Sequence, residues 1–347
     1  MTTADERETR PSRRRVRRTP SLADVAREAG VAPITASRVA NGAENVDEAT
    51  RSRVLDTMGR LGYRPNLAAR ALATGHFKSI GVLTSSMRSP GNMWTIGEIV
   101  TAAAERGYTV TLLPFELRGG ETVVNAYDRL THEGVDGAIV VAERRLDDDT
   151  SITLPPGVPV IFIDAGGGDE YTVIDSDQAG GARMATEHLL DLGHRTVHHI
   201  AGPRESYAAM RRLAAWRRVL EERGLRVPEA PIGDWRSTSG HEAVDALLAD
   251  GATAIFAAND QMAFGVLQRL HELGIDVPGQ VSVVGFDDVI DADASWPPLT
   301  TVRQAFDEVG RVAIADLLER IADHDRPTAG VVVPVQLIVR GSTAAPA

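Results

Sequence analysis

The apolar positions of residues 21–41 recur at helical spacing and are interrupted by one tight turn. One face of a first helix is formed by Leu22, Val25, Ala26 and Ala29. Gly30 ends that helix, because glycine adopts the left-handed cap conformation without a clash at Cβ. Pro33 begins a second helix where no backbone N–H is needed, and Ala36, Val39 and Ala40 can turn inward. The pattern predicts a helix-turn-helix, with an ordinary helical hairpin as the alternative.

From residue 79 onward, short apolar runs alternate with segments of helical period. Runs that suit buried parallel strands are Ser79–Thr84, Tyr108–Pro114, Asp136–Val141 and Val158–Ile163, with helices near Thr95–Arg106 and Thr122–His132. A second series follows Asp177, with helices Gln178–Leu192, Tyr207–Arg223 and Gln261–Leu273 and strands Val197–Ala201, Ala254–Ala257 and Val281–Gly285. Two such series predict an α/β core of two doubly wound lobes with parallel sheets.

The length of 347 residues suits two or three domains. Charge is distributed unevenly along the chain. The net charge is −11, yet residues 1–78 carry 15 Lys and Arg against 9 Asp and Glu, whereas the remainder carries 22 against 39. A basic head on an acidic body attracts phosphate at one end only. Residues 1–20 are arginine-rich and poor in apolar residues, so we expect a disordered tail. That tail either adds nonspecific phosphate contacts or has no specific role.

Several classes of protein are excluded or disfavoured by what the chain lacks. With no cysteine, disulfides and thiolate metal sites are excluded. No apolar run is long enough to span a membrane, and no apolar segment follows the N-terminal arginines as in a secretory signal. We therefore expect a cytoplasmic protein without a membrane partner. No nucleophile–base pair or metal constellation emerges, so we expect neither enzymatic activity nor a cofactor.

Four histidines close together in the sequence invite a metal-site interpretation: His188, His194, His198 and His199. However, His198 and His199 are neighbours on a predicted strand, where successive side chains point to opposite faces. We therefore do not expect them to bind a metal.

The helix-turn-helix continues into a capped third helix starting at Val46–Arg51 and then into Tyr63–Leu72. The whole run from Leu22 to Leu72 resembles the DNA-binding headpiece and hinge of the LacI/GalR family of transcriptional regulators. This chain has Ala32 where members usually have Ser, which removes a helix cap and a phosphate contact. It has Ala36 where they usually have Val, which leaves the headpiece core slightly underfilled.

The resemblance implies a division of the chain into parts of known fold. An all-α helix-turn-helix headpiece would occupy residues 21–65 and a hinge helix with its linker residues 66–78. A periplasmic-binding-protein-like core of two lobes would follow at 79–340, with a tail at 341–347. In the family's crossing order, a helix from Gln304 to about Ala322 returns to the first lobe. The strands at Gly330–Val339 return to the second. Lobe 1 would thus be about 79–176 and 304–328, and lobe 2 about 177–303 and 329–340.

Candidate DNA contacts lie on the second helix, because the first residues of a recognition helix usually meet base edges. Pro33 and Ile34 offer no hydrogen bonds and would read only shape or a thymine methyl group. Arg38 can donate a bidentate pair to guanine. The resemblance adds phosphate contacts from Thr35, Ser37, Asn41 and Thr50. For Thr35 and Ser37, satisfying the helix ends is an equally good interpretation.

The predicted hinge begins after Pro65, where Asn66 can cap a helix from Leu67 to Ala73. A helix that short is not stable alone in water, because nucleation is costly. The resemblance implies that it folds when two copies pair across the minor groove, and that Leu72 wedges into the central base step. The alternative for Leu72 is a packing role in the linker. We place Asn66 and Ala69 with Leu72 among the DNA-binding residues.

Candidate ligand-binding residues follow the predicted strands, because ligands of open α/β sheets sit at the carboxyl ends of strands. Polar side chains in that position are Ser85, Asp164, Asn259 and Asp287. Carboxylates and amides recognise vicinal hydroxyls. The aromatic faces of Trp235 and Phe306 can cover the apolar side of a pyranose ring, and Arg212 adds rigid donors.

The resemblance sharpens this interpretation. Segments similar to those of sugar-responsive family members are Gly233–Trp235, Ala258–Ala263, Val284–Asp288 and Pro297–Gln304. It implies that Arg212, Asn259 and Asp287 bind sugar hydroxyls. It places Ser85, Asp164, Trp235 and Phe306 elsewhere in the pocket. A galactoside or glucoside is favoured over a purine. The alternatives are that Asp260 caps a helix, Asp288 forms a turn and Phe306 belongs to the core.

The sequence thus predicts a homodimeric repressor that binds a pseudo-palindromic operator in double-stranded DNA and is controlled by a small sugar or glycoside. A regulator that uses its ligand as corepressor, or an activator, is the alternative of the same class. A sugar-binding protein without a transcriptional role is the alternative of another class. The chain ends shortly after the strand Gln336–Arg340, without a heptad tail, which favours a dimer over a tetramer.

Overall fold

The computed structural model describes residues 20–43, 45–64, 71, 75–87, 89–115, 123–142, 157–165 and 171–347. The chain divides into two compact units, Met1–Phe77 and Lys78–Ala347. The predicted basic tail up to residue 19 and the hinge residues Asn66, Ala69 and Leu72 lie outside the described residues. No helix in the described ranges is long and apolar enough to cross a membrane.

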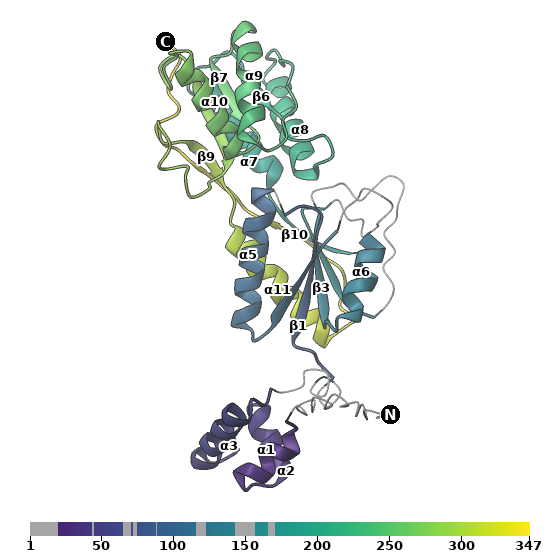
Figure 1. Ribbon diagram of the computed structural model, residues 1–347. Helices are drawn as coiled ribbons and strands as arrows, with labels where there is room; N and C mark the ends of the chain where they lie inside the picture. Colours follow the sequence, from purple (N-terminus) through teal and green to yellow (C-terminus); the bar gives the residue numbers. More distant parts are fainter. Residues whose placement is uncertain are drawn as a thin grey trace, which may run out of the picture. The chain divides into compact units, whose positions relative to one another are not determined.

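The first unit contains the predicted helix-turn-helix and a third helix (Figure 1): α1 Leu22–Ala29, α2 Pro33–Ala40 and α3 Glu48–Leu61. Ser21 and Asp24 form a capping box at the start of α1, and Gly30 ends that helix in the left-handed conformation at φ 66°. Ala32 caps α2 without a side-chain hydrogen bond, as predicted. A small apolar core joins the helices through Val25, Ala26, Ala29, Ala36, Val39, Val54 and Met58.

The first lobe of the second unit is a parallel sheet in the order β10-β5-β4-β3-β1-β2. Its strands are β1 Ser79–Thr84, β2 Thr109–Pro114, β3 Gly137–Val141, β4 Val160–Ile163, β5 Thr172–Ser176 and β10 Gly330–Val333. Helices α5 Pro90–Glu105 and α11 Phe306–Ala322 pack together on one face, and α6 Val123–His132 covers the other (Figure 1). Because both faces are covered, the central strands are buried along their length and consist largely of apolar residues.

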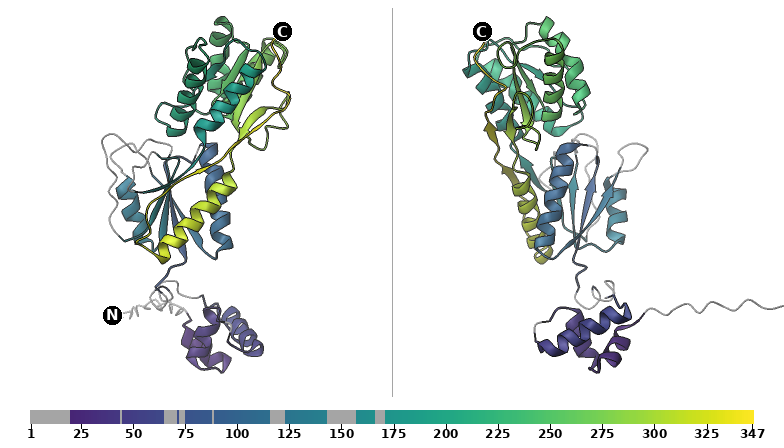
Figure 2. Two further views of the ribbon diagram at one scale, coloured as in Figure 1. Left: turned by 180° about the vertical axis from the view of Figure 1, so that it is seen from behind. Right: turned by 60° about the vertical axis from the view of Figure 1, so that its left-hand side comes forward.

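The second lobe is a sheet in the order β11-β9-β8-β7-β6, seen from two sides in Figure 2. Its strands are β6 His198–Ile200, β7 Ala254–Ala257, β8 Ser282–Asp287, β9 Thr300–Arg303 and the antiparallel edge strand β11 Gln336–Ile338. Helices α7 Gln178–Asp191 and α8 Tyr207–Glu222 cover one face, and α9 Ser237–Ala249 and α10 Asp260–Glu272 cover the other. The two lobes confirm the predicted fold class.

The structure corrects the prediction at several elements. The prediction that residues 330–339 return to the second lobe is wrong for their first half, because β10 pairs with β5 in the first sheet. Pro334 follows β10, and proline cannot donate to a ladder, so it separates β10 from β11. The strands β5 and β9 and the helix α9 were not predicted from the sequence. Asp175 interrupts the apolar pattern of β5, and threonines begin β9.

The chain passes between the lobes at residues 176–178, 303–306 and 333–336. Two of these crossings are joined directly, because the backbone N–H of Asp177 donates to the carbonyl of Val333 at 2.8 Å. The other crossing carries Gln304. Side chains at the crossings are therefore placed to contact both lobes.

Candidate functional site

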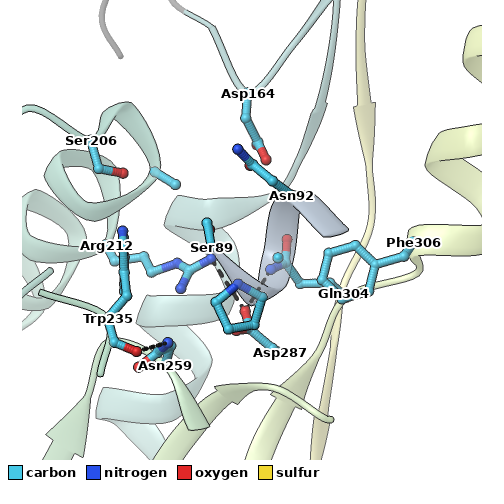
Figure 3. A pocket seen from close by; sticks show the side chains of 13 residues that line it. Ser89, Asn92, Asp164, Ser206, Arg212, Trp235, Asn259, Asp287, Gln304 and Phe306 are labelled. Carbon is cyan, nitrogen blue, oxygen red and sulfur yellow. Dashed lines mark hydrogen bonds and ion pairs between the residues drawn. The ribbon is translucent and has the colours of Figure 1, made fainter. Parts of the chain in front are cut away.

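A pocket lies where the crossings meet the carboxyl ends of strands from both lobes (Figure 3). It is lined by Ser89, Pro90, Gly91, Asn92, Asp164, Ser206, Ala208, Arg212, Trp235, Asn259, Asp287, Gln304 and Phe306. The lining includes every predicted ligand residue except Ser85. The backbone N–H of Ser85 bonds to the carbonyl of Val141 at 3.4 Å, which extends the ladder by one residue before the chain turns towards α5.

Four buried side chains close a ring of polar contacts beside the pocket. Arg212 donates through Nε to Gln178 Oε1 at 2.8 Å, and Gln178 Nε2 donates to Gln304 Oε1 at 3.0 Å. Gln304 Nε2 donates to Asp287 Oδ1 at 2.7 Å, and the same oxygen lies 3.6 Å from Arg212 Nη2. Each member orients the next, so the ring fixes the Arg212 cation and the Asp287 carboxylate in one geometry.

Arg212 has further contacts that hold its guanidinium in place. Its Nη1 donates to the carbonyl of Ala258, and its charge lies 3.7 Å from the centre of the Phe286 ring. The side chain is 4% exposed. Burial lowers the pKa of Arg212, an effect that Asp287 and Asp164 oppose. The result is a fixed, desolvated set of donors of the kind that discriminates between hydroxyl arrangements.

Two carboxylates approach the pocket from different lobes. Asp164 follows β4 and Asp287 ends β8. Burial raises the pKa of Asp287 to about 6 and also raises the pKa of Asp164, while Arg212 opposes both shifts. Both residues adopt positive φ, 54° for Asp164 and 118° for Asp287, which residues other than glycine rarely do. Backbone strain of this kind is typical of binding sites.

Asn259 lines the pocket, and its side-chain amide already forms hydrogen bonds within the protein. Its Oδ1 accepts from Met262 N at 3.0 Å, which caps α10, and its Nδ2 donates to Trp235 O at 3.1 Å and to Gln261 Oε1 at 2.9 Å. One lone pair of Oδ1 is left for a ligand.

Because Asn259 caps α10, the interpretation of Asp260 as the helix cap is wrong. Asp260 is buried and accepts hydrogen bonds from Thr301 Oγ1 at 2.6 Å and from Val289 N at 2.9 Å.

Gln178 and Gln304, which connect the ring, were not predicted as site residues. Gln178 begins the helix after β5, and Gln304 follows β9. Both strands carry polar residues and do not show the apolar pattern of a buried strand, so neither glutamine was predicted to follow a strand. Asp288 has no place in the pocket lining. It pairs with Arg303 and Arg340, each at 2.6 Å.

The four histidines of the second lobe have separate partners. His188 contacts Thr343 Oγ1 at 3.0 Å and His194 contacts Thr253 Oγ1 at 2.9 Å. His198 lies 3.0 Å from Asp250 Oδ2, whereas His199 is bonded to the carbonyl of Phe256 at 2.8 Å. Burial lowers the pKa of His199 to about 3. The neutral ring packs between Trp216 and Phe256, at centroid distances of 5.3 and 4.6 Å.

The predicted DNA contacts of the headpiece lie on α2 and its C-cap Asn41, with Thr50 on α3. Ala36 and Val39 are buried, while Pro33, Ile34, Arg38 and Asn41 are exposed. Thr35, Ser37 and Thr50 are partly buried. The inward face of α2 thus holds the fold, and its outer face is available to a partner.

The architecture is that of a helix-turn-helix unit followed by a two-lobed ligand-binding core, and comparisons with known proteins agree with it. Residues 21–66 match the bacterial regulatory proteins of the lacI family, and residues 186–343 match the periplasmic binding protein-like domain. The lactose operon repressor of Escherichia coli K12 is 34% identical over 331 residues, which cover 94% of this chain and 91% of the repressor. This chain belongs to the LacI family of bacterial regulatory proteins.

Solved structures of relatives superimpose over nearly the whole chain. A lac repressor dimer bound to operator and the anti-inducer ONPF is 33% identical, with a TM-score of 0.84, covering 94% of this chain and 100% of that chain. A complex of the transcriptional regulator CelR with cellobiose is 31% identical, with a TM-score of 0.67, covering 93% and 99%. The matched relatives are transcriptional regulators.

Proposed function

We propose that this protein is a sequence-specific DNA-binding repressor whose operator affinity is controlled by a small sugar bound between its lobes. The observation that carries the proposal is the polar ring around Arg212, which holds a cation and a carboxylate rigidly beside a pocket with aromatic walls. Paired donors and acceptors with Trp235 and Phe306 beside them suit the hydroxyls and the apolar face of a sugar ring. We assign sugar-hydroxyl contacts to Arg212 and Asp287 first.

On the DNA side, we assign base contacts to exposed residues of α2, two at its start and one in its last turn. Pro33 and Ile34 would meet the groove by shape, and Arg38 would donate to a guanine. We assign phosphate contacts to Thr35, Ser37, Asn41 and Thr50. The hinge contacts of Asn66, Ala69 and Leu72 stay a prediction, since these residues lie outside the described ranges.

Control of operator binding follows from the position of the pocket. Asp164 belongs to the first lobe and Asp287 to the second, so one ligand that contacts both is sensitive to how the lobes are arranged. Only a ligand with different affinities for the two arrangements can shift them. The proposed consequence is that the hinges of two paired copies separate and unfold, which releases the operator.

A homodimer would pair through an apolar surface on the second lobe. Trp296 is 90% exposed and Ile290 75% exposed, and Trp296 lines a hollow together with Phe264 and Leu267. Large side chains this exposed are typical of protein–protein contacts. The variant Trp296→Asp should be monomeric in light scattering, whereas Leu273→Asp, at another exposed apolar position of the lobe, should stay dimeric.

We further propose that the ligand is bound and released without chemical change. Binding to chromosomal DNA would place this activity in the cytoplasm. A bound sugar should therefore be recovered unaltered after prolonged incubation with the protein, and its turnover would contradict the proposal.

The function is tested by fluorescence anisotropy of a labelled pseudo-palindrome from the promoter of this protein's own gene, with and without a panel of sugars. The salt concentration is held fixed, because phosphate contacts make affinity steeply salt-dependent. Tight binding that one sugar releases supports an inducible repressor. Binding that a ligand strengthens indicates a corepressor. Binding no tighter than to a scrambled duplex, under every ligand, would overturn the proposed function.

A further inference from the structure

A buried ion pair joins the two lobes beside one of the crossings. Asp175 lies on β5 of the first lobe, and its Oδ2 accepts from Arg211 Nη1, on α8 of the second lobe, at 3.0 Å. The Asp175 side chain is 8% exposed, and the crossing at residues 176–178 begins directly after it. Because the two partners belong to different lobes, a movement of one lobe relative to the other changes this contact.

The carboxyl group of Asp175 is only partly satisfied in this arrangement of the lobes. Its Oδ1 is buried and has no hydrogen-bond partner among the described residues. Ile163 pairs with Ile174 across the sheet, which places Asp164 and Asp175 side by side at the ends of neighbouring strands. An ionised carboxylate that is buried with an unused oxygen and lies near a second carboxyl group is unstable. It becomes more stable if the lobes move so that water reaches Oδ1, whereas the protonated group carries no charge that needs hydration.

The other elements around β5 are apolar or neutral. The flanking strands β4 and β10 contain no titratable residue, and Val332 of β10 pairs with Asp175. Helix α11 packs apolar residues against this sheet. On α8, Tyr207 lies beside Arg211, whose guanidinium is 5.5 Å from the centre of the ring. The charged groups that act on Asp175 are therefore Asp164 and Arg211.

We propose that Asp175 is a proton switch of the lobe arrangement. Its protonated form stabilises the arrangement described here, and its ionised form favours a second arrangement in which the carboxylate is hydrated. The proposal uses the two lobe arrangements of the proposed function and adds the proton as a second ligand of that equilibrium.

The direction of the switch follows from linkage. In the described arrangement, burial and then the neighbouring Asp164 raise the pKa of Asp175 from 3.8 to about 7, and Arg211 opposes the shift. A hydrated carboxyl group keeps a pKa near the lower value, so the described arrangement binds the proton more tightly. Raising the pH towards 7 and beyond therefore shifts the lobes to the second arrangement.

The experiment measures the distance between the lobes of the full-length protein by double electron–electron resonance. The chain has no cysteine, so nitroxide labels can be attached at Glu133→Cys, which follows α6, and at Glu242→Cys on α9, both exposed positions. Labelled chains are diluted into excess unlabelled chains, so that only distances within one chain are recorded. From pH 5.5 to pH 8, the ratio of the second arrangement to the described one should rise by at least about tenfold.

Variants of the pair separate Asp175 from other titrating groups. Asp175→Asn should lose most of the rise, because an amide does not titrate. The part that remains belongs to groups such as Asp287, whose pKa is raised by burial to about 6. Arg211→Met should enlarge the second population at pH 8, because the buried carboxylate loses its cationic partner. Asp293→Asn, at an exposed position of the second lobe, is the matched control and should behave as wild type.

The possible failures are distinct. A distance that does not change with pH, or that changes equally in wild type and Asp175→Asn, overturns the switch and leaves the sugar-responsive repressor intact. A smaller second population in Arg211→Met than in wild type at pH 8 overturns it as well. If the distance changes as expected but operator affinity depends on pH identically in wild type and Asp175→Asn, the switch stands and the proposed coupling of the lobes to the operator fails.

Discussion

The headpiece and the cleft hold their proposed binding residues in opposite ways. On α2, Ile34 is 61% exposed and Arg38 is also exposed, while a separate apolar face below them holds the fold. In the cleft, Arg212 is 4% exposed, and Nε, Nη1 and Nη2 of its guanidinium all have partners. Recognition and folding thus use different residues in the headpiece and the same residues in the cleft.

This difference has a physical cause. DNA is a large polyanion that can be recognised at a surface, where long side chains remain hydrated until they bind. A small neutral ligand has few groups, so it is distinguished only where donors and acceptors are fixed and shielded from water. The consequence is that substitutions of the exposed binding residues in the headpiece should change affinity alone, whereas substitutions of the binding residues in the cleft should change stability as well.

The largest effect is expected for Arg212→Met. Without the cation, Asp164 and Asp287 stay buried near the pocket, and removing one partner of a buried ion pair typically costs about 3–5 kcal/mol. The second unit should unfold at a lower temperature in calorimetry, and sugars should no longer release the operator. Arg212→Lys should also lose the response, because an ammonium cannot reproduce the planar set of donors. An unchanged unfolding temperature would refute the view that this residue stabilises the fold.

The next effect is expected for Arg38→Ala in the headpiece. Operator affinity should fall by about 10–100-fold, since a bidentate contact to a base contributes ~1–3 kcal/mol of discrimination. The unfolding temperature should stay at the wild-type value. Arg27→Ala, exposed on α1 and paired with Asp24, is the matched control. If affinity for a scrambled duplex falls by the same factor as affinity for the operator, Arg38 contacts phosphate rather than a base.

A third prediction concerns pH and the pair between Asp175 and Arg211, which join the two lobes at 3.0 Å. Burial and the neighbouring Asp164 raise the pKa of Asp175 from 3.8 to about 7, while Arg211 opposes the shift. The folded state therefore binds the proton more tightly than the unfolded chain. The contribution of the Asp175 carboxyl group to the free energy of unfolding is fully present below pH 3.8 and is lost as the pH rises towards 7.

The test compares Asp175→Asn with wild type in thermal unfolding at pH 4, 5.5 and 8. As the pH rises from 4 to 8, the unfolding temperature of Asp175→Asn should fall less than that of wild type, because the neutral amide does not titrate. Asp293→Asn, at an exposed loop position, should keep the wild-type profile. Parallel profiles for Asp175→Asn and wild type would show that this carboxyl does not contribute to the pH dependence.

The smallest effect is expected for Ala32→Ser at the start of α2. The helix has no side-chain cap there, and a serine cap usually adds about 0.5–2 kcal/mol. Hydrogen exchange on the full-length protein should slow in the amides of α2 while those of the lobes stay unchanged. Faster or unchanged exchange in α2 would mean that the serine makes no capping bond.

The elements predicted most closely were those whose pattern is local. The headpiece helices follow from the spacing of apolar residues and from Gly30 and Pro33, which act within their own turns. The buried strands of the first lobe follow from short apolar runs. The missed strands β5 and β9 carry polar residues, because they lead into crossings between the lobes where those residues find partners.

The sequence by itself determined the class of the protein, its helix-turn-helix, its alternating lobes and most of the residues that line the pocket. Only the tertiary structure decided how those residues act. It showed that Asn259 is used in capping and positioning, and it added Gln178 and Gln304 to the ring around Arg212. The capping bond of Asn259 is local, but its bond to the carbonyl of Trp235 spans 24 positions and the bond between Gln178 and Gln304 spans 126. A periodic pattern reports only on neighbours within one element, whereas this geometry is created when the chain crosses between the lobes.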